Sequence, residues 1–234
     1  DSEAPAVVLT TTASRFAGIF TVTATFSEPV TGFDINDVVV TNGSPSNFNS
    51  VSNSIYTFDV TPSADGAVTV NTNASGAADN SGNGSAAATQ LSVTYDTTAP
   101  TVTIVPTDGA TDVASTSNIT ITFNEAVRLL DDTALTDDNV DALITLKDTD
   151  ASGNDIAFDA TISGQVITVD PTSDFTSDQV VYVAIGATVE DILGYAASAA
   201  NSTFTVADSV IPTVTLSTTG SLVSGPFLVI ATFS

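Results

Sequence analysis

The chain has 234 residues, enough for about two domains, and 42% of them are hydrophobic, so it has the material for packed cores. Its net charge is −24, with 27 acidic residues and three basic ones. This charge makes nucleic acid and anionic membrane surfaces poor partners, because both are bound through clustered Lys and Arg. The sequence contains no His and no Cys, which excludes Ser-His-Asp and Cys-His catalysis and also His/Cys zinc sites.

No apolar stretch is as long as a membrane-spanning helix, and no signal peptide opens the chain. We therefore expect a mature or internal fragment without membrane insertion. The absence of Cys is compatible with export if the core or bound metals supply the stability that disulfides would otherwise give.

Three segments share the sequence Asp-x-x-x-Pro, the Asp–Pro motif, which is followed by a strand rich in Val and Thr. The three copies are residues 1–5, 96–100 and 208–212, so they stand 95 and 112 residues apart. This spacing is the size of an immunoglobulin-like (Ig-like) sandwich. The sequence therefore predicts an all-β chain of tandem Ig-like β-sandwiches, two complete and one partial, with modules at 1–96, 97–207 and 208–234.

In the first module, apolar residues alternate with Thr over residues 19–27, which is the period-two pattern of a half-buried strand. The Gly, Pro, Asn and Ser residues of 42–50 predict a loop, and Ser63–Gly66 predicts a turn. The other strands are predicted at 6–11, 36–41, 56–60, 68–70 and 91–95.

The second module repeats this plan with insertions. An acidic stretch, residues 131–141, interrupts the series of strands, and we expect a short turn of helix over residues 131–139. Regular short strands separated by turn residues are typical of a sandwich. The strands are predicted at 101–105, 119–123, 143–146, 157–162, 166–169, 180–185 and 202–206.

Residues 208–234 repeat residues 1–27 without a gap, at an offset of 207, with 15 of the 27 positions identical. A repeat this regular indicates a chain built from similar modules. Two strands cannot form a sandwich alone, so two interpretations of 208–234 stay open. Either the native polypeptide continues, or these strands pair with the sheet of a neighbouring copy.

Several stretches of the sequence resemble known families. The first module resembles the bacterial Ig-like modules of giant repetitive surface adhesins, and the second resembles the related Ig-like domain first described in S-layer proteins. The stretches are residues 24–38, 61–66 and 74–83 in the first module, and 106–113, 119–127 and 189–194 in the second. The resemblance implies secreted or surface-anchored bacterial proteins, often with Ca²⁺ between domains. Such modules also serve as spacers in secreted enzymes.

Acidic residues recur where the Ig-like topology brings the start of the first strand and several loops to one pole of each module. They are Asp1, Glu28 and Asp79 in the first module, with Asp34 and Asp37 close by, and Asp96, Glu125 and Asp191 in the second, with Asp138 as the counterpart of the nearby pair. Carboxylates gathered in this way repel one another unless a cation lies among them. Ligands that are all oxygen favour Ca²⁺.

The preceding module would contribute a further carboxylate to each Ca²⁺ site from its opposite pole. Asp65 would then face the Asp–Pro motif that begins at Asp96, and Asp174 would face the one that begins at Asp208. The alternative is plain turn chemistry, because Asp before Pro, Asp-Gly turns and Asp-x-x-Gly loops are all favoured by local hydrogen bonds. The sequence leaves both interpretations open.

These features favour a mechanical function over catalysis. We expect a non-enzymatic stalk or filament segment of a large extracellular adhesin on a bacterial surface, in which interdomain Ca²⁺ limits bending. Its partners would be the adjacent Ig-like modules of the same chain and neighbouring copies, through strand or end-to-end contact. The alternatives are a subunit of an S-layer or self-assembling surface fibre, and a non-catalytic spacer of a secreted hydrolase.

Overall fold

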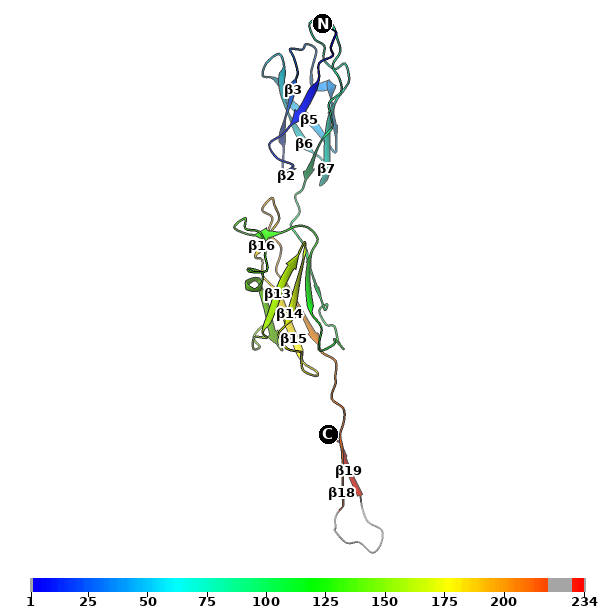
Figure 1. Ribbon diagram of the computed structural model, residues 1–234, viewed down its shortest axis with the longest axis vertical. Coiled ribbons are helices and arrows are strands. Elements are labelled where there is room, and N and C mark those ends of the chain that lie inside the picture. The colour runs from blue at the N-terminus through cyan, green and yellow to red at the C-terminus, as the bar shows by residue number, and fades with distance from the viewer. Residues whose placement is uncertain (1, 219–228, 234) are drawn as a thin grey trace. The chain divides into compact units, whose positions relative to one another are not determined.

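The structure is a computed structural model that describes residues 2–218 and 229–233, so Asp1 of the expected metal set lies outside the described residues. The chain folds as two compact units, and each unit contains two β-sheets of three or four strands (Figure 1). Within the described residues the helices are two short 3₁₀ turns, and none of them could cross a membrane. The prediction of an all-β chain of tandem Ig-like sandwiches is confirmed.

The first unit has two four-stranded sheets, ordered β1-β3-β6-β5 and β2-β8-β7-β4. All pairs are antiparallel except β2 with β8. This is the strand order of an Ig sandwich. The elements are β1 (Val7–Thr10), β2 (Arg15–Phe16), β3 (Phe20–Phe26), the 3₁₀ turn η1 (Ile35–Asp37), β4 (Val38–Thr41), β5 (Gly43–Ser50), β6 (Ile55–Pro62), β7 (Gly66–Thr72) and β8 (Leu91–Tyr95).

The core of the first unit lies between the two sheets because alternate residues of each strand point inward. In β3 the apolar residues are buried and the threonines face outward, as the sequence predicts. Val22 and Phe58 from one sheet, and Val68 and Val70 from the other, are fully buried. Burial of such side chains is the main stabilising contribution to the fold.

The second unit has the sheets β13-β14-β10-β9 and β12-β15-β17, together with a small ribbon, β11-β16. Its separate core is built around Ile119, Ile121, Phe123 and Phe204. The elements are β9 (Val102–Val105), β10 (Ile119–Phe123), β11 (Arg128–Leu129), the 3₁₀ turn η2 (Asp141–Leu143), β12 (Ile144–Asp148), β13 (Phe158–Ser163), β14 (Val166–Pro171), β15 (Val180–Ile185), β16 (Val189–Glu190) and β17 (Ala200–Thr205). The last two strands, β18 (Val214–Thr218) and β19 (Val229–Phe233), pair antiparallel as a hairpin.

The loop predicted at 42–50 is wrong, because these residues form strand β5 at the edge of a sheet. Pro45 is tolerated there because an edge strand has one side that needs no donor. The register with β6 shifts between Ser46 and Asn49, and Asn47 between them has a φ of 51°. This bulge turns Phe48 toward Phe33 and Tyr56 of the core.

The acidic stretch 131–141 protects an edge strand. Its residues 131–139 form turns rather than the helical turn that we expected, and η2 begins only at Asp141. Strand β13 is at the edge of its sheet, and its Ala160 and Ile162 amides donate to the carboxylates of Asp141 and Asp137, at 2.8 and 2.7 Å. These carboxylates satisfy amides that would otherwise be open to another strand.

Candidate metal centre

Three of the predicted carboxylates come together in the structure. One carboxylate oxygen each of Asp96, Glu125 and Asp191 lies within 4.8 Å of the others. Two oxygens that share a Ca²⁺ ion at about 2.3–2.6 Å stand at most about 5 Å apart, so these three fit around one ion. Asp191 is only 1% exposed, and the other two side chains are half-buried.

Local hydrogen bonds bring the second Asp–Pro motif to this position. The backbone amide of Thr101, just after the motif, donates to the side-chain oxygen of Asn124 at 2.6 Å. The Asn124 amide in turn donates to the Thr101 carbonyl at 3.2 Å. The chain that follows Asp96 is thereby held beside the residue that precedes Glu125.

The buried Asp191 leaves one oxygen unsatisfied. Its Oδ1 accepts from the amides of Leu193 and Tyr195, at 2.8 and 2.9 Å, and Gly194 closes this turn with a φ of 90°. Its Oδ2 is buried and has no hydrogen-bond partner in the part of the chain that the structure describes. An unsatisfied buried carboxylate oxygen is costly, and a hard cation shared with Asp96 and Glu125 would satisfy it.

Asp79 occupies the matching loop of the first unit, but both of its carboxylate oxygens are satisfied. Its Oδ1 accepts from the amides of Ser81 and Asn83, both at 2.8 Å, in the same pattern as Asp191. Its Oδ2 accepts from the side-chain amide of Asn83 at 2.7 Å. The two loops therefore differ at the fourth residue after the aspartate, where the loop of Asp191 has Tyr195 in place of asparagine.

The side-chain amide of Asn83 holds the pKa of Asp79 below the ordinary value of 3.8, with backbone amides adding to the effect. A carboxyl whose pKa is lowered by folding stabilises the folded state at any pH above the pKa that it has in the unfolded state. This stabilisation is lost as the pH falls through the pKa that the carboxyl has in the folded state. We expect Asn83→Ala to destabilise the first unit at pH 7, and the difference from the wild type to shrink between about pH 5 and pH 2.

Urea unfolding across this range, in EDTA, checks the pH dependence. Asn49→Ala, at an exposed position of β5, is the control and should show no such trend. A deficit for Asn83→Ala that stays constant with pH would contradict the role of the ionised Asp79 carboxylate.

Asp34 and Asp37 of the predicted set stabilise a turn of the first unit. Asp34 caps η1, because its Oδ1 accepts from the Asn36 amide at 2.7 Å, and its own amide donates to Asp37 Oδ2 at 2.9 Å. Glu28 is half-buried in the loop after β3. In the second unit, Asp138 is exposed in the stretch before η2.

The second and third Asp–Pro motifs each contact a turn that precedes them in the chain. The Thr97 hydroxyl donates to Asp65 at 3.0 Å, so Asp65 meets the motif that begins at Asp96. At the third motif, Asp208 accepts from the Ser177 hydroxyl at 3.0 Å. Asp96 and Asp208 also cap their own turns, since Asp96 accepts from the Thr98 amide and Asp208 from the Val210 amide.

Asp174 lies three residues before Ser177 and lines a small polar hollow at the surface. The hollow is also lined by Ser115, Asn118 and Asp170. At the third Asp–Pro motif, the hydrogen bond that the structure shows from the preceding turn to Asp208 comes from a serine hydroxyl. Sequence reasoning considered carboxylates only and therefore missed Ser177.

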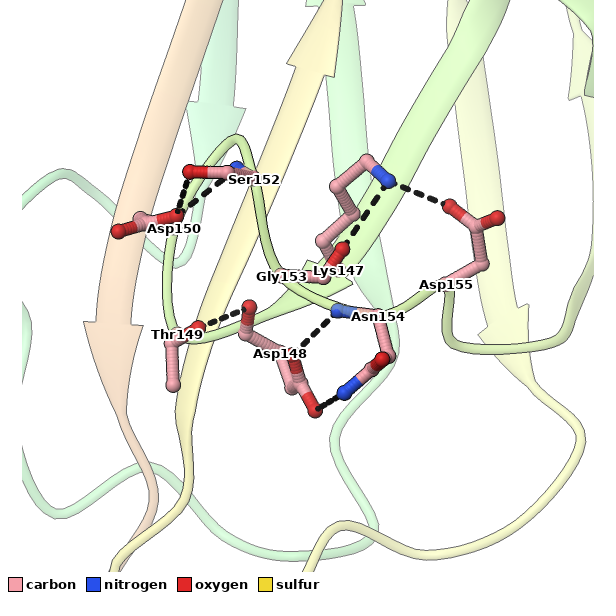
Figure 2. A network of polar contacts seen from close by, with 8 residues as sticks. All are labelled: Lys147, Asp148, Thr149, Asp150, Ser152, Gly153, Asn154 and Asp155. Carbon is pink, nitrogen blue, oxygen red and sulfur yellow. Dashed lines mark hydrogen bonds and ion pairs between the residues drawn. The ribbon is translucent and has the colours of Figure 1, made fainter.

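Sequence reasoning also missed an acidic loop at residues 147–155. Figure 2 shows the network of hydrogen bonds and the ion pair within this loop. Asp148 accepts from the backbone and side-chain amides of Asn154, at 2.6 and 2.9 Å. Asp150 accepts from the amide and hydroxyl of Ser152. The Lys147 ammonium lies 2.7 Å from Asp155 and donates to the Gly153 carbonyl at 3.2 Å. The chain's own donors therefore satisfy these carboxylates, with Lys147 as the cation.

Gly153 is required by this network. A Cβ at this position would overlap the carbonyl oxygen of Asp148, so Gly153→Ala forces the backbone of the loop to move. We expect it to destabilise the second unit by about 1–3 kcal/mol, measured by thermal unfolding. Gly18→Ala, where an added Cβ meets nothing within 4 Å, is the control. If Gly153→Ala left the stability of the second unit unchanged, the loop would be able to rearrange freely.

Comparison with known families identifies both units. One family model described as a bacterial Ig-like domain matches residues 1–95, and a second with the same description matches residues 96–206. The chain belongs to the bacterial Ig-like domain proteins. All three residues of the candidate metal centre fall within the range of the second match. No curated protein matches the chain.

The comparison with solved structures finds matches of low sequence identity. InvD of Yersinia pseudotuberculosis aligns over 95% of this chain and 66% of its own, with 16% identity and a TM-score of 0.42. The adhesin InvE of the same organism aligns over 86% and 58%, with 15% identity and a TM-score of 0.29. The I9–I11 tandem from titin aligns over 92% and 67%, with 10% identity and a TM-score of 0.30. This bacterial Ig-like chain thus spans about two thirds or less of each of these chains.

Proposed function

We propose that the chain is a structural stalk segment of a secreted or surface-anchored bacterial adhesin, and that Ca²⁺ bound by Asp96, Glu125 and Asp191 stiffens the joint between its modules. Membership of the bacterial Ig-like domains supports the structural role. The ligand and anchoring of the adhesin would belong to other parts of such a protein.

One observation supports the calcium site most directly. Asp191 Oδ2 is buried and has no hydrogen-bond partner among residues 2–218 and 229–233, and one carboxylate oxygen each of Asp96, Glu125 and Asp191 lies within 4.8 Å of the others. Ca²⁺ takes six to eight oxygens in flexible geometry, so three carboxylates would leave positions for carbonyl oxygens and water. Because Asp96 begins the second Asp–Pro motif, an ion there would tie the segment that links the modules to the second module.

Small-angle X-ray scattering of the full chain in about 5 mM Ca²⁺ and in EDTA tests the stiffening directly, as millimolar Ca²⁺ saturates most extracellular sites. We expect the spread of particle dimensions to narrow with Ca²⁺ and to widen again in EDTA. Titration calorimetry on the same sample should show that Ca²⁺ binds to the chain. Identical scattering in both conditions would refute the mechanism of stiffening and leave the Ig-like stalk in place.

A further inference from the structure

In each unit, the last strand of the sandwich pairs in parallel with a short segment that follows the first strand. We call this pairing the parallel contact. In the first unit the segment is β2, which pairs with the last strand, β8. The Thr94 amide donates to the Ser14 carbonyl at 2.8 Å, and the Asp96 amide donates to the Phe16 carbonyl at 3.1 Å. Backbone hydrogen bonds therefore join the beginning and the end of this module directly.

The second unit has the same contact over a longer stretch. Residues 106–113, which follow β9, run beside the last strand, β17, and Val113 forms a parallel bridge just after it. The Gly109 amide donates to the Thr203 carbonyl near one end, and the Ala207 amide donates to the Val113 carbonyl near the other, both at 2.8 Å. Both modules are thus closed in the same way.

Two side chains strengthen the contact in the second unit. The Ser202 hydroxyl donates to the Pro106 carbonyl at 2.7 Å, and Ser202 is only 1% exposed. The Thr203 amide donates to the Asp108 carboxylate at 2.9 Å. These bonds extend the hydrogen-bonded pairing to the very start of the segment.

The two units differ in the length of this contact and not in their first strand pair. The antiparallel pairs β1–β3 and β9–β10 each contain four residue pairs. The parallel contact, by comparison, covers residues 14–16 in the first unit and residues 106–113 in the second. A property that depends on the parallel contact should therefore be stronger in the second unit.

The direction of the two strands decides how the contact responds to tension. Parallel strands begin at the same end of their pair. The chain reaches the first of them at its start and leaves the module from the end of the second, so tension along the chain pulls the two strands in opposite directions along their common axis. All hydrogen bonds between them then share the load, whereas bonds that are opened from one end break one after another.

We propose that the parallel contacts are mechanical clamps that let each module bear tension, and that the second module holds to a higher force than the first. The longer contact spreads the same tension over more hydrogen bonds. Forced unfolding is governed by the rate of unfolding and not by equilibrium stability, so this load-bearing function is separate from thermal stability. That the chain is under tension in nature rests on the proposed stalk function, but the clamps do not depend on the calcium site.

The direction of pulling tests the clamp of the second module. The chain contains no Cys, so pairs of introduced thiols define where the force is applied. Handles on Thr107→Cys and Ser209→Cys pull the contact lengthwise, and handles on Thr107→Cys and Asn201→Cys pull it apart from one end. All three positions are exposed. In single-molecule force spectroscopy in EDTA, we expect the lengthwise geometry to need a force at least about twofold higher.

Pulling the unmodified full chain from tags at its two ends tests the order of unfolding. The first unit, from β1 to β8, and the second, from β9 to β17, release roughly 310 and 370 Å of extended chain at about 3.5 Å per residue, so the released length identifies each event. We expect the shorter release to occur at the lower force.

A matched pair of variants separates the clamp from general stability. Ser202→Ala removes a bond of the clamp and should lower the force of the longer release. Ile167→Val, at a position of β14 that is 0% exposed, destabilises the same module away from the contact. It should lower the Tm of this module but leave the force of the longer release unchanged.

Equal forces in the two handle geometries would overturn the proposal, because the direction of loading would then not matter. It would also fail if the first unit outlasted the second, or if Ser202→Ala and Ile167→Val lowered the force equally. Should a Cys variant not fold, as judged by circular dichroism, end-to-end pulling of the unmodified chain still decides the order. These forces are the same whether or not the chain is a stalk segment and are measured without Ca²⁺, so failure of the clamp is distinguishable from failure of the proposed function.

Discussion

Asp191→Asn is expected to abolish the calcium-dependent stabilisation of the second module. The asparagine keeps an oxygen for the Leu193 and Tyr195 amides, but it places an amide group where the buried Oδ2 would bind the ion. An ion at about 100 times its dissociation constant stabilises the folded state by about 2.7 kcal/mol. In a domain of about 100 residues this corresponds to a rise of roughly 10 °C or more in Tm.

Differential scanning calorimetry in Ca²⁺ and in EDTA measures this difference. In EDTA the variant should melt close to the wild type, because the loop hydrogen bonds remain. The control is Asp159→Asn, an exposed carboxylate of β13, which changes the charge equally and should keep the full response to Ca²⁺. A complete Ca²⁺ response in Asp191→Asn would show that the ion, if bound, lies elsewhere.

Phe58→Ala is expected to destabilise the first module by about 3–5 kcal/mol and to leave the second module unchanged. Phe58 is fully buried, and it belongs to a core cluster that shares no residue with the core of the second unit. The reciprocal variant is Phe204→Ala, at a position that is 1% exposed in the second core.

Hydrogen exchange followed by mass spectrometry in rising denaturant assigns each loss of protection to a module. Phe58→Ala should lower the protection of β3 and β6, and Phe204→Ala that of β15 and β17. If either variant lowered protection in both modules by the same amount, the two cores would unfold as a single cooperative unit, and the modular description of stability would be wrong.

Most of the sandwich could be predicted because apolar alternation dominates its core strands. In β3 and β10, β-branched and aromatic residues at every second position leave little choice of structure. Strand β5 has no such pattern, since its side chains are mostly polar and it is held by backbone pairing with β6. Local composition therefore favoured a loop, and tertiary pairing decided the outcome.

The candidate metal centre was predictable in part for a different reason. Ig-like topology alone predicts that Asp96, Glu125 and Asp191 approach one another. It does not predict whether a nearby donor already satisfies a carboxylate, as Asn83 does for Asp79. Whether the carboxylate is satisfied depends on the side chain four residues after the aspartate in each loop. This difference can be seen only from the three-dimensional structures of the two loops.

The carboxylates of Asp137 and Asp141 affect how the edge strand β13 can interact with another copy of the chain. When the exposed strand edges of two protein molecules meet, their sheets can join through backbone hydrogen bonds. Two outward amides of strand β13 already donate to these aspartates. A second copy of the chain that approached this edge would meet negative charge instead of open donors, which disfavours pairing between the two sheets.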